Sequence, residues 1–197
     1  MRVVSVSIII GAALMSTALS GCIGAGMNSE LIVRDSATFP TVSGMNLHGQ
    51  TIEIPRGLAG RIRVIVVAFE QRQQGDVDTW INALAPDLVA QPDLALYELP
   101  VIYTGSASFR FWVNNGMRSG ITDEAARKRT ITVYTDREKF YNALGVRQST
   151  ITTFIIAPDD TIVWRTDGPA SNENLTGARS AIESVRAGMA SREPKTP

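Results

Sequence analysis

The chain has very few of the residues on which redox and zinc chemistry depend. Its 197 residues include a single cysteine, Cys22, and a single histidine, His48. One cysteine cannot close a disulfide within the chain or form a Cys-x-x-Cys pair. A zinc site would have to be assembled from carboxylates around His48, and zinc uses carboxylates less readily than histidine or cysteine. The sequence therefore predicts no metal site and no dithiol catalysis.

The chain also lacks an excess of charge of either sign. Its 19 lysine and arginine residues are balanced by 19 aspartate and glutamate residues, and its pI is near 6.6. Electrostatic binding to nucleic acid needs a basic face, so we expect no nucleic-acid partner. A P-loop, a Gly-x-Gly-x-x-Gly turn after a strand and a Gly-x-Ser-x-Gly elbow are also missing from the sequence. These absences leave no candidate catalytic residue and no implied cofactor.

The N-terminus has the three parts of a secretory signal. Met1 and Arg2 precede an apolar run over residues 3–19, and the run ends in the tetrapeptide Leu19-Ser20-Gly21-Cys22. This tetrapeptide resembles the lipobox of bacterial lipoproteins, in which the cysteine is diacylated and becomes the new N-terminus. The resemblance implies lipidation of Cys22, with palmitate among the acyl chains, and a mature domain without any thiol. The alternatives are an ordinary signal peptide or a short membrane anchor, although the run is shorter than the roughly 20 residues that a spanning helix needs.

The rest of the chain has the pattern of one domain with polar ends. We expect a signal peptide over residues 1–21, a tether over 22–38, a folded domain over 39–190 and a polar tail over 191–197. Attachment to the membrane would depend on the acyl chains at Cys22. Such an anchor would place the domain on the cell membrane or the outer membrane, facing the periplasm or the cell exterior.

Several stretches have the composition of β-strands. The stretch 61–69 is dense in β-branched residues and apolar on both faces, as the central strand of a covered sheet must be. Residues 94–103 form a second strand, which we expect Pro100 to interrupt. The remaining strands are expected at residues 130–134, 152–157 and 161–165, with a small edge hairpin over 44–55.

Helical spacing separates these strands. Asp76 is the expected N-cap of a helix that Pro86 would break into two pieces. Another helix, capped by Ser106, would end near Met117. The remaining helices are expected after Thr122, from Asp136 to Gly145, and along the apolar stripe from Leu175 to Met189. Strands that alternate with helices predict an α/β fold of three layers, a central mixed sheet with helices on both faces.

The second half of the chain contains three motifs in a fixed order: Gly145-Val146, Thr152-Thr153-Phe154, and a Pro158-Asp159-Asp160 turn followed by a strand. With these motifs it resembles periplasmic thioredoxin-like and peroxiredoxin-like proteins. The resemblance implies a three-layer thioredoxin-like fold, in which the catalytic Cys-x-x-Cys would stand in the loop after strand 61–69.

Two departures from that family pattern affect the chemistry. The loop reads Glu70-Gln71-Arg72-Gln73-Gln74, without a cysteine, and Ile151 stands in the position of the family's cis-proline. Thiol–disulfide exchange requires an attacking thiolate. We therefore expect a thioredoxin-like fold without thioredoxin chemistry, and the fold by itself does not give the function.

Short motifs over most of the mature chain carry a narrower resemblance. They are Gly44-Met45-Asn46-Leu47, Ile54-Pro55, Gln73-Gln74, Tyr97-Glu98-Leu99-Pro100 and Ile162-Val163-Trp164-Arg165. With these motifs the chain is similar to the mitochondrial ATP synthase assembly factor family and its bacterial relatives. Members of that family are thioredoxin-like proteins without a redox dithiol, and the mitochondrial ones assist assembly of the membrane sector of ATP synthase.

The loop after the first central strand is the leading candidate site. Gln71, Arg72, Gln73 and Gln74 stand beyond the carboxyl end of a central strand and at the start of a helix, where open α/β sheets bind ligands. We interpret these side chains as a contact surface for a partner, with Arg72 as the charge donor. The alternative is a solvated loop left over from an ancestral active site.

Three further residues extend this candidate surface. Met117 and Arg118 lie in a glycine-punctuated segment that would cover the same end of the sheet, unless Met117 instead fills the core. Ile151 replaces the proline that borders the dithiol in the family.

Together these features predict a lipid-anchored, non-redox domain that binds a protein partner in the cell envelope, as an assembly factor or chaperone. The alternative is a binding protein or enzyme for a small anion or metabolite that uses the loop at Arg72. An enclosed polar pocket at that loop would favour the small ligand, and a flat exposed patch would favour the protein partner.

Overall fold

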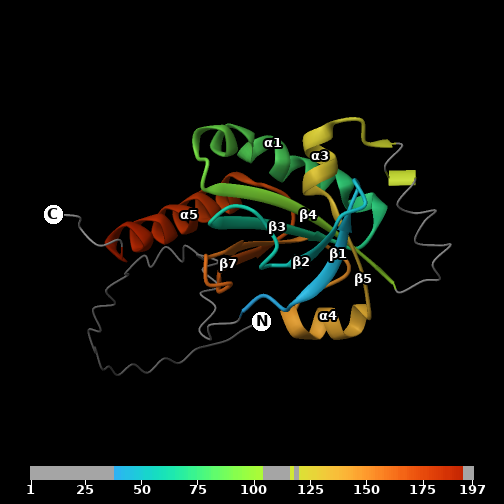
Figure 1. Ribbon diagram of the computed structural model, residues 1–197. Helices are drawn as coiled ribbons and strands as arrows, with labels where there is room; N and C mark the ends of the chain where they lie inside the picture. The colour runs from blue at the N-terminus through green and yellow to red at the C-terminus, as the bar shows by residue number, and fades with distance from the viewer. Residues whose placement is uncertain (1–37, 104–115, 118–119, 193–197) are drawn as a thin grey trace, which may run out of the picture. The chain divides into compact units, whose positions relative to one another are not determined.

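The computed structural model describes residues 38–103, 116–117 and 120–192 (Figure 1). These residues belong to one compact unit, Leu31–Pro197. The expected signal peptide, Cys22, Arg118 and almost all of the helix expected after Ser106 lie outside the described residues.

A mixed sheet of seven strands forms the middle layer of the fold. The strands lie in the order β2 (Thr51–Ile54), β1 (Val42–Asn46), β5 (Ile131–Thr135), β4 (Leu94–Tyr103), β3 (Ile62–Ala68), β6 (Thr152–Ile156) and β7 (Ile162–Asp167). Strands β3, β4 and β5 are parallel neighbours, whereas β6 is antiparallel to both β3 and β7. Every residue of β3 is buried, as its dense β-branched composition predicts.

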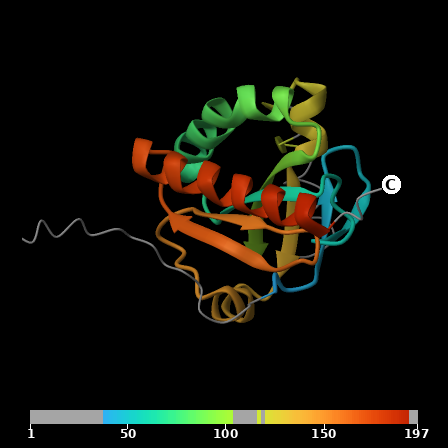
Figure 2. The same ribbon diagram turned by 90° about the vertical axis from the view of Figure 1, so that its left-hand side faces the viewer.

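Helices cover both faces of this sheet, as the three-layer prediction requires. Helices α1 (Gln74–Ala90), α3 (Glu124–Arg129) and α5 (Asn172–Arg192) lie on one face, and α4 (Arg137–Leu144) lies on the other. Figure 2 separates the layers, with α5 in red crossing the sheet on the side opposite to α4.

Each face of the sheet has its own apolar core. Between the sheet and helices α1 and α5, the rings of Trp80 and Trp164 meet edge to face with centroids 6.2 Å apart. On the α4 side, Phe39 packs edge to face against both Phe140 and Phe154. Full burial of one large apolar side chain stabilises a fold by roughly 1.5–3 kcal/mol, so these two clusters fix the helices to the sheet.

Helix α1 begins earlier than predicted and is not broken. The prediction that Asp76 is its N-cap is wrong, because the 3-10 turn Gln71–Gln73 leads directly into the helix and Asp76 lies in the first turn. The predicted break at Pro86 is also wrong, since the helix continues to Ala90. Pro86 removes one backbone hydrogen bond, but Leu84 before it and Leu88 after it both pack into the same core, which keeps the two halves in line.

Strand β4 also passes through its proline. Pro100 pairs with Ala68 in the last register position between β4 and β3, and pairing with β5 continues from Val101 onward. The proline therefore stands where the strand changes its main neighbour, so its missing N–H group interrupts neither ladder. The expected interruption does not occur.

Several predicted element ends are confirmed. The Asp136 carboxylate caps α4 by accepting from the N–H groups of Glu138 and Lys139, and Gly145 ends that helix with a φ of 60°. Asp123 caps α3 by accepting from the N–H of Ala126 at 2.8 Å. The 158–160 turn joins β6 and β7 as an antiparallel hairpin, and β1 with β2 forms the expected edge hairpin.

Candidate functional site

The loop after β3 is held from inside by Gln73. Its Oε1 accepts from the N–H groups of Phe69 at 2.8 Å and Glu70 at 3.2 Å, and its Nε2 donates to the Gln148 carbonyl at 2.8 Å. Glu70 and Gln73 together form a capping box for the 3-10 turn. Since Gln73 is only 4% exposed, it is an interior anchor of the loop and contributes almost no surface.

Ile151 is likewise an interior residue. Its side chain is fully buried in the core under α1 and α5, and its carbonyl accepts from the Gly168 N–H at 2.9 Å. The cis peptide bond found among the described residues joins Ile54 to Pro55, so the bond before Ile151 is trans. The expectation that Ile151 lies on a contact surface does not fit this position, because a buried isoleucine presents no side chain to a partner.

Three of the predicted loop residues remain exposed. Gln71, Arg72 and Gln74 all lie at the surface, and the Arg72 side chain is 72% exposed. The Arg72 guanidinium pairs with the Glu70 carboxylate across the turn. Gln74 donates from Nε2 to Asp78 Oδ1 at 3.0 Å. We call Gln71, Arg72 and Gln74 the loop surface.

Met117 touches the sheet instead of standing free above it. The Thr132 hydroxyl on β5 lies 3.8 Å from the Met117 sulfur, and Thr132 is fully buried. Met117 itself is half-buried, so this contact holds it against β5 but does not place it in the core. Its neighbour Arg118 lies outside the described residues.

Arg137 borders the loop and was not found by sequence reasoning. Its Nη2 donates to the Phe69 carbonyl at 3.0 Å, and its guanidinium lies 5.8 Å and 5.9 Å from the ring centroids of Phe69 and Tyr141. A cation over aromatic rings at such distances is attracted by their electron-rich faces. Because β3 and β5 run parallel, the residues that follow the two strands lie at the same end of the sheet. That topology was the signal that could have placed Arg137 beside the loop.

Glu98 is a second residue that sequence reasoning did not identify as part of the site. It lies on β4, is only 4% exposed, and accepts a hydrogen bond from the Thr130 hydroxyl at 3.2 Å. Burial raises the pKa of its carboxyl, and the nearby Asp78 charge acts in the same direction. The sequence does indicate this residue, because Glu98 is the one acidic side chain within the otherwise apolar run 94–103.

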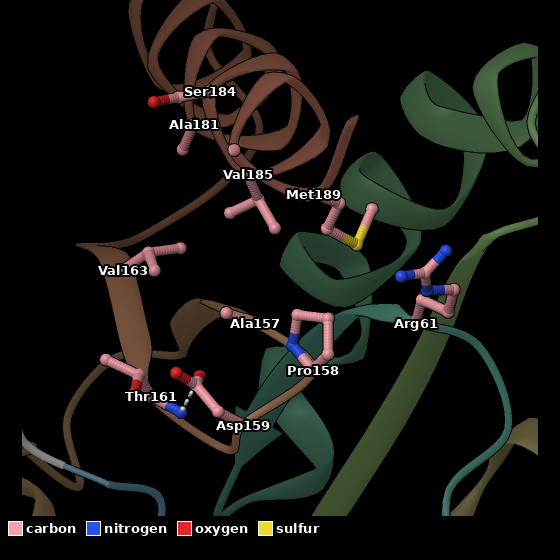
Figure 3. Close-up of a pocket in the computed structure, with 11 residues that line it drawn as sticks. Arg61, Ala157, Pro158, Asp159, Thr161, Val163, Ala181, Ser184, Val185 and Met189 are labelled. Carbon is pink, nitrogen blue, oxygen red and sulfur yellow. Dashed lines mark hydrogen bonds between the residues drawn. The ribbon is translucent and has the colours of Figure 1, made fainter. Parts of the chain in front are cut away.

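A groove of about 600 Å³ lies at the other end of the sheet, away from the loop after β3 (Figure 3). It runs between α5, where Val185 and Met189 line it, and the β6–β7 turn, where Pro158 and Thr161 line it. Arg61, just before β3, lies at one end of it. None of the predicted loop residues lines this groove, so this hollow does not serve the loop surface.

Within residues 38–103, 116–117 and 120–192, no three His, Cys, Asp or Glu side chains gather closely enough to hold a metal ion. Among the helices of the same described segments, none combines the length and the hydropathy that crossing a membrane requires.

Comparison with known proteins identifies the fold. No protein-family model matches the chain, and no curated protein shows significant sequence similarity to it. A putative electron transport protein from Aquifex aeolicus matches with a TM-score of 0.53 at 13% identity, over 77% of this chain and 98% of that one. BsSco, of the Sco family of cytochrome c oxidase assembly proteins, matches with a TM-score of 0.52 at 7% identity, over 77% and 95%.

A thiol:disulfide interchange protein from Bacteroides sp. also matches, with a TM-score of 0.52 at 9% identity, over 81% of this chain and 95% of that one. At these identities the likeness concerns the fold alone. Together with the mixed sheet covered by helices on both faces, it shows that this chain has an α/β thioredoxin-like fold.

Proposed function

We propose that this chain is a lipid-anchored, non-redox thioredoxin-like domain that binds a protein partner in the cell envelope through the loop surface, as an assembly factor or chaperone. Cys22 is the membrane attachment point in this proposal. The assembly role follows the mitochondrial family that the sequence resembles, and the Sco protein of similar fold also belongs to a family of assembly proteins.

The buried amide of Gln73 is the observation that carries the proposal. It occupies the loop in which the family resemblance places the catalytic dithiol, and it satisfies two backbone N–H groups and one carbonyl there. The loop from Glu70 to Gln74 contains no cysteine, and the Gln73 amide is buried inside it. The hydrogen bonds of Gln73 therefore hold the loop backbone in place beneath its exposed side chains.

The outer side chains suit contact with another protein. The loop surface combines one guanidinium with two neutral amides, and Arg137 adds a second cation beside the Phe69 carbonyl. Arginine is enriched at protein interfaces, where it combines charge with a planar donor group. A backbone fixed from inside lowers the ordering cost of binding.

Crosslinking in cells tests this proposal. A photoreactive amino acid is placed at Gln71, which is exposed, and the matched control is placed at Val89, which is 88% exposed near the far end of α1. We expect one envelope protein to be captured from position 71 and not from position 89. ATP synthase membrane subunits in that capture would support the narrower assembly role. Equal captures from both positions would contradict a partner at the loop surface.

A further inference from the structure

The groove between α5 and the β6–β7 turn is lined mostly by apolar side chains. Val185 and Met189 of α5 face Pro158 of the turn across it (Figure 3). Val163 of β7 also lines it and keeps 37% of its surface exposed. Apolar surface that stands open in a hollow is stabilised when another apolar group covers it. The groove therefore suits aliphatic side chains from another segment.

The described part of the chain begins at the wall of this groove. Thr38 forms an isolated antiparallel bridge with Thr161, and Thr161 lines the groove. The next residue strengthens this attachment, because the Phe39 N–H donates to the Asp160 carbonyl at 3.1 Å. The residues that precede Thr38 are therefore tethered directly beside the groove.

These preceding residues include a suitable occupant. Leu31, Ile32 and Val33 are three consecutive aliphatic residues within the expected tether. They lie outside the described residues, although Leu31 is the first residue of the compact unit that contains the groove. An extended chain from Val33 to Thr38 spans up to roughly 17 Å, which is enough to reach into a groove that begins at Thr161. Because one end of this short segment is already held, docking it costs little additional loop entropy.

The C-terminal tail is a poorer occupant. Helix α5 ends at Arg192, shortly after Met189, so the tail also starts close to the groove. Residues 193–197 read Glu-Pro-Lys-Thr-Pro and contain no leucine, isoleucine or valine. The aliphatic lining of the groove therefore matches residues 31–33 and not the tail.

We propose that residues 31–33 dock in this groove and fix the start of the domain to α5 and the β6–β7 turn. One consequence rests on the lipid anchor of the proposed function. Docking leaves only residues 22–30 as a free tether, which extends to about 30 Å at most. The tether then leaves the domain at the end of the sheet opposite to the loop surface.

Methyl NMR of the full-length chain tests the docking. In Ile32→Ser we expect the methyl signals of Val163, Val185 and Met189 to shift, because the groove loses an aliphatic contact. The matched control Ile23→Ser, in the same tether but outside the proposed segment, should leave these signals unchanged. Signals that ignore Ile32→Ser would overturn the proposal. If they ignore it and instead shift with protein concentration, a second copy of the chain covers the groove and the proposal also fails.

Photocrosslinking in cells gives a second readout. A photoreactive amino acid at Ile32 should form an internal link to α5 or to the β6–β7 turn, whereas a probe at Met27 should not. Gly188→Leu should abolish the link, because Gly188 lines the groove and an added side chain would occupy it. An added Cβ at Gly188 meets no atom within 4 Å, and leucine favours helix, so this variant should stay folded. A link that persists in Gly188→Leu, or a probe at Ile32 that captures only other proteins, would overturn the docking.

Docking and partner binding fail separately. The link from position 32 joins two parts of one chain, whereas the capture from Gln71 joins two different chains. An internal link without any capture from Gln71 leaves the docking standing and refutes the partner. Capture from Gln71 without an internal link refutes the docking alone.

Discussion

Arg63 Nη1 lies 2.9 Å from Asp160 Oδ1, which joins the central strand to the β6–β7 turn. The Arg63 side chain is only 5% exposed, and it also donates to the carbonyls of Pro55, at 3.1 Å, and Ala157. The Arg63 guanidinium therefore links β3 to the chain after β2 and to the β6–β7 turn. This contact lies at the end of the sheet opposite to the loop surface.

Arg63→Met should destabilise the protein by about 3 kcal/mol, because it leaves Asp160 and two carbonyls without their buried donor. Arg56→Met is the matched control: Arg56 also faces Asp160, at 3.4 Å, but its side chain is 75% exposed. We expect its cost to stay below about 1 kcal/mol. Urea unfolding of both variants measures the difference, and similar midpoints for the two would refute the structural role given to Arg63.

Gln73→Ala should reduce the free energy of unfolding by about 1–3 kcal/mol, because two backbone N–H groups and the Gln148 carbonyl lose their partner. Gln71→Ala, in the same turn but exposed, should change it by less than about 0.5 kcal/mol. Thermal and urea unfolding of the pair test this. If both substitutions cost the same, Gln73 is not the anchor of the loop.

Glu98→Gln should change how stability depends on pH. The pKa of Glu98 is raised in the folded state above its ordinary value of 4.5, so between those two values the folded chain binds more protons than the unfolded chain. The stability of the wild type therefore falls as pH rises through this window and stays lowered above it. The variant lacks this loss and should be the more stable of the two at neutral pH. Urea midpoints from pH 4 to 8 check the sign, and a wild-type advantage at pH 7 would contradict it.

Two glycines in α5 should respond differently to alanine. At Gly188 an added Cβ would meet no atom within 4 Å, so the alanine should stabilise the helix by about 0.5–1 kcal/mol. At Gly177 an added Cβ would lie 3.1 Å from the Trp164 ring. We expect crowding there to cancel or reverse the gain. Equal melting temperatures for the two variants would show that α5 does not pack on Trp164 as described.

Cys22→Ala should abolish incorporation of labelled palmitate and move the protein out of the membrane fraction. This follows from the lipobox resemblance of Leu19-Ser20-Gly21-Cys22 and from the dependence of membrane binding on acyl chains. Metabolic labelling followed by cell fractionation measures both effects. Unchanged labelling in the variant would remove the lipid anchor from the proposed function.

Local patterns predicted much of the fold. The β-branched run at β3 and the caps Asp136 and Gly145 are all found where the sequence indicates them, because each depends on a few neighbouring residues. The errors at Pro86 and Pro100 have the opposite origin. In both cases packing or strand pairing with distant segments overrides a local preference.

The candidate site was harder to predict than the fold. The loop was located correctly at the carboxyl end of β3, but the burial of Gln73 depends on Gln148, which is 75 residues away in the sequence. Arg137 reaches the loop only because β5 is parallel to β3 through β4. Long-range topology decides which side chains share the site, and the local patterns that predict each strand do not show which strands are neighbours in the sheet.

The amide of Gln73 has one more consequence. Hydrogen bonds between the Gln73 amide and backbone groups hold the loop after β3 in place. No residue from 38 to 192 is a cysteine. Oxidants and reductants that reshape thiol-based loops therefore have nothing to act on here. We therefore expect the loop surface to keep the same shape in oxidising and in reducing buffers.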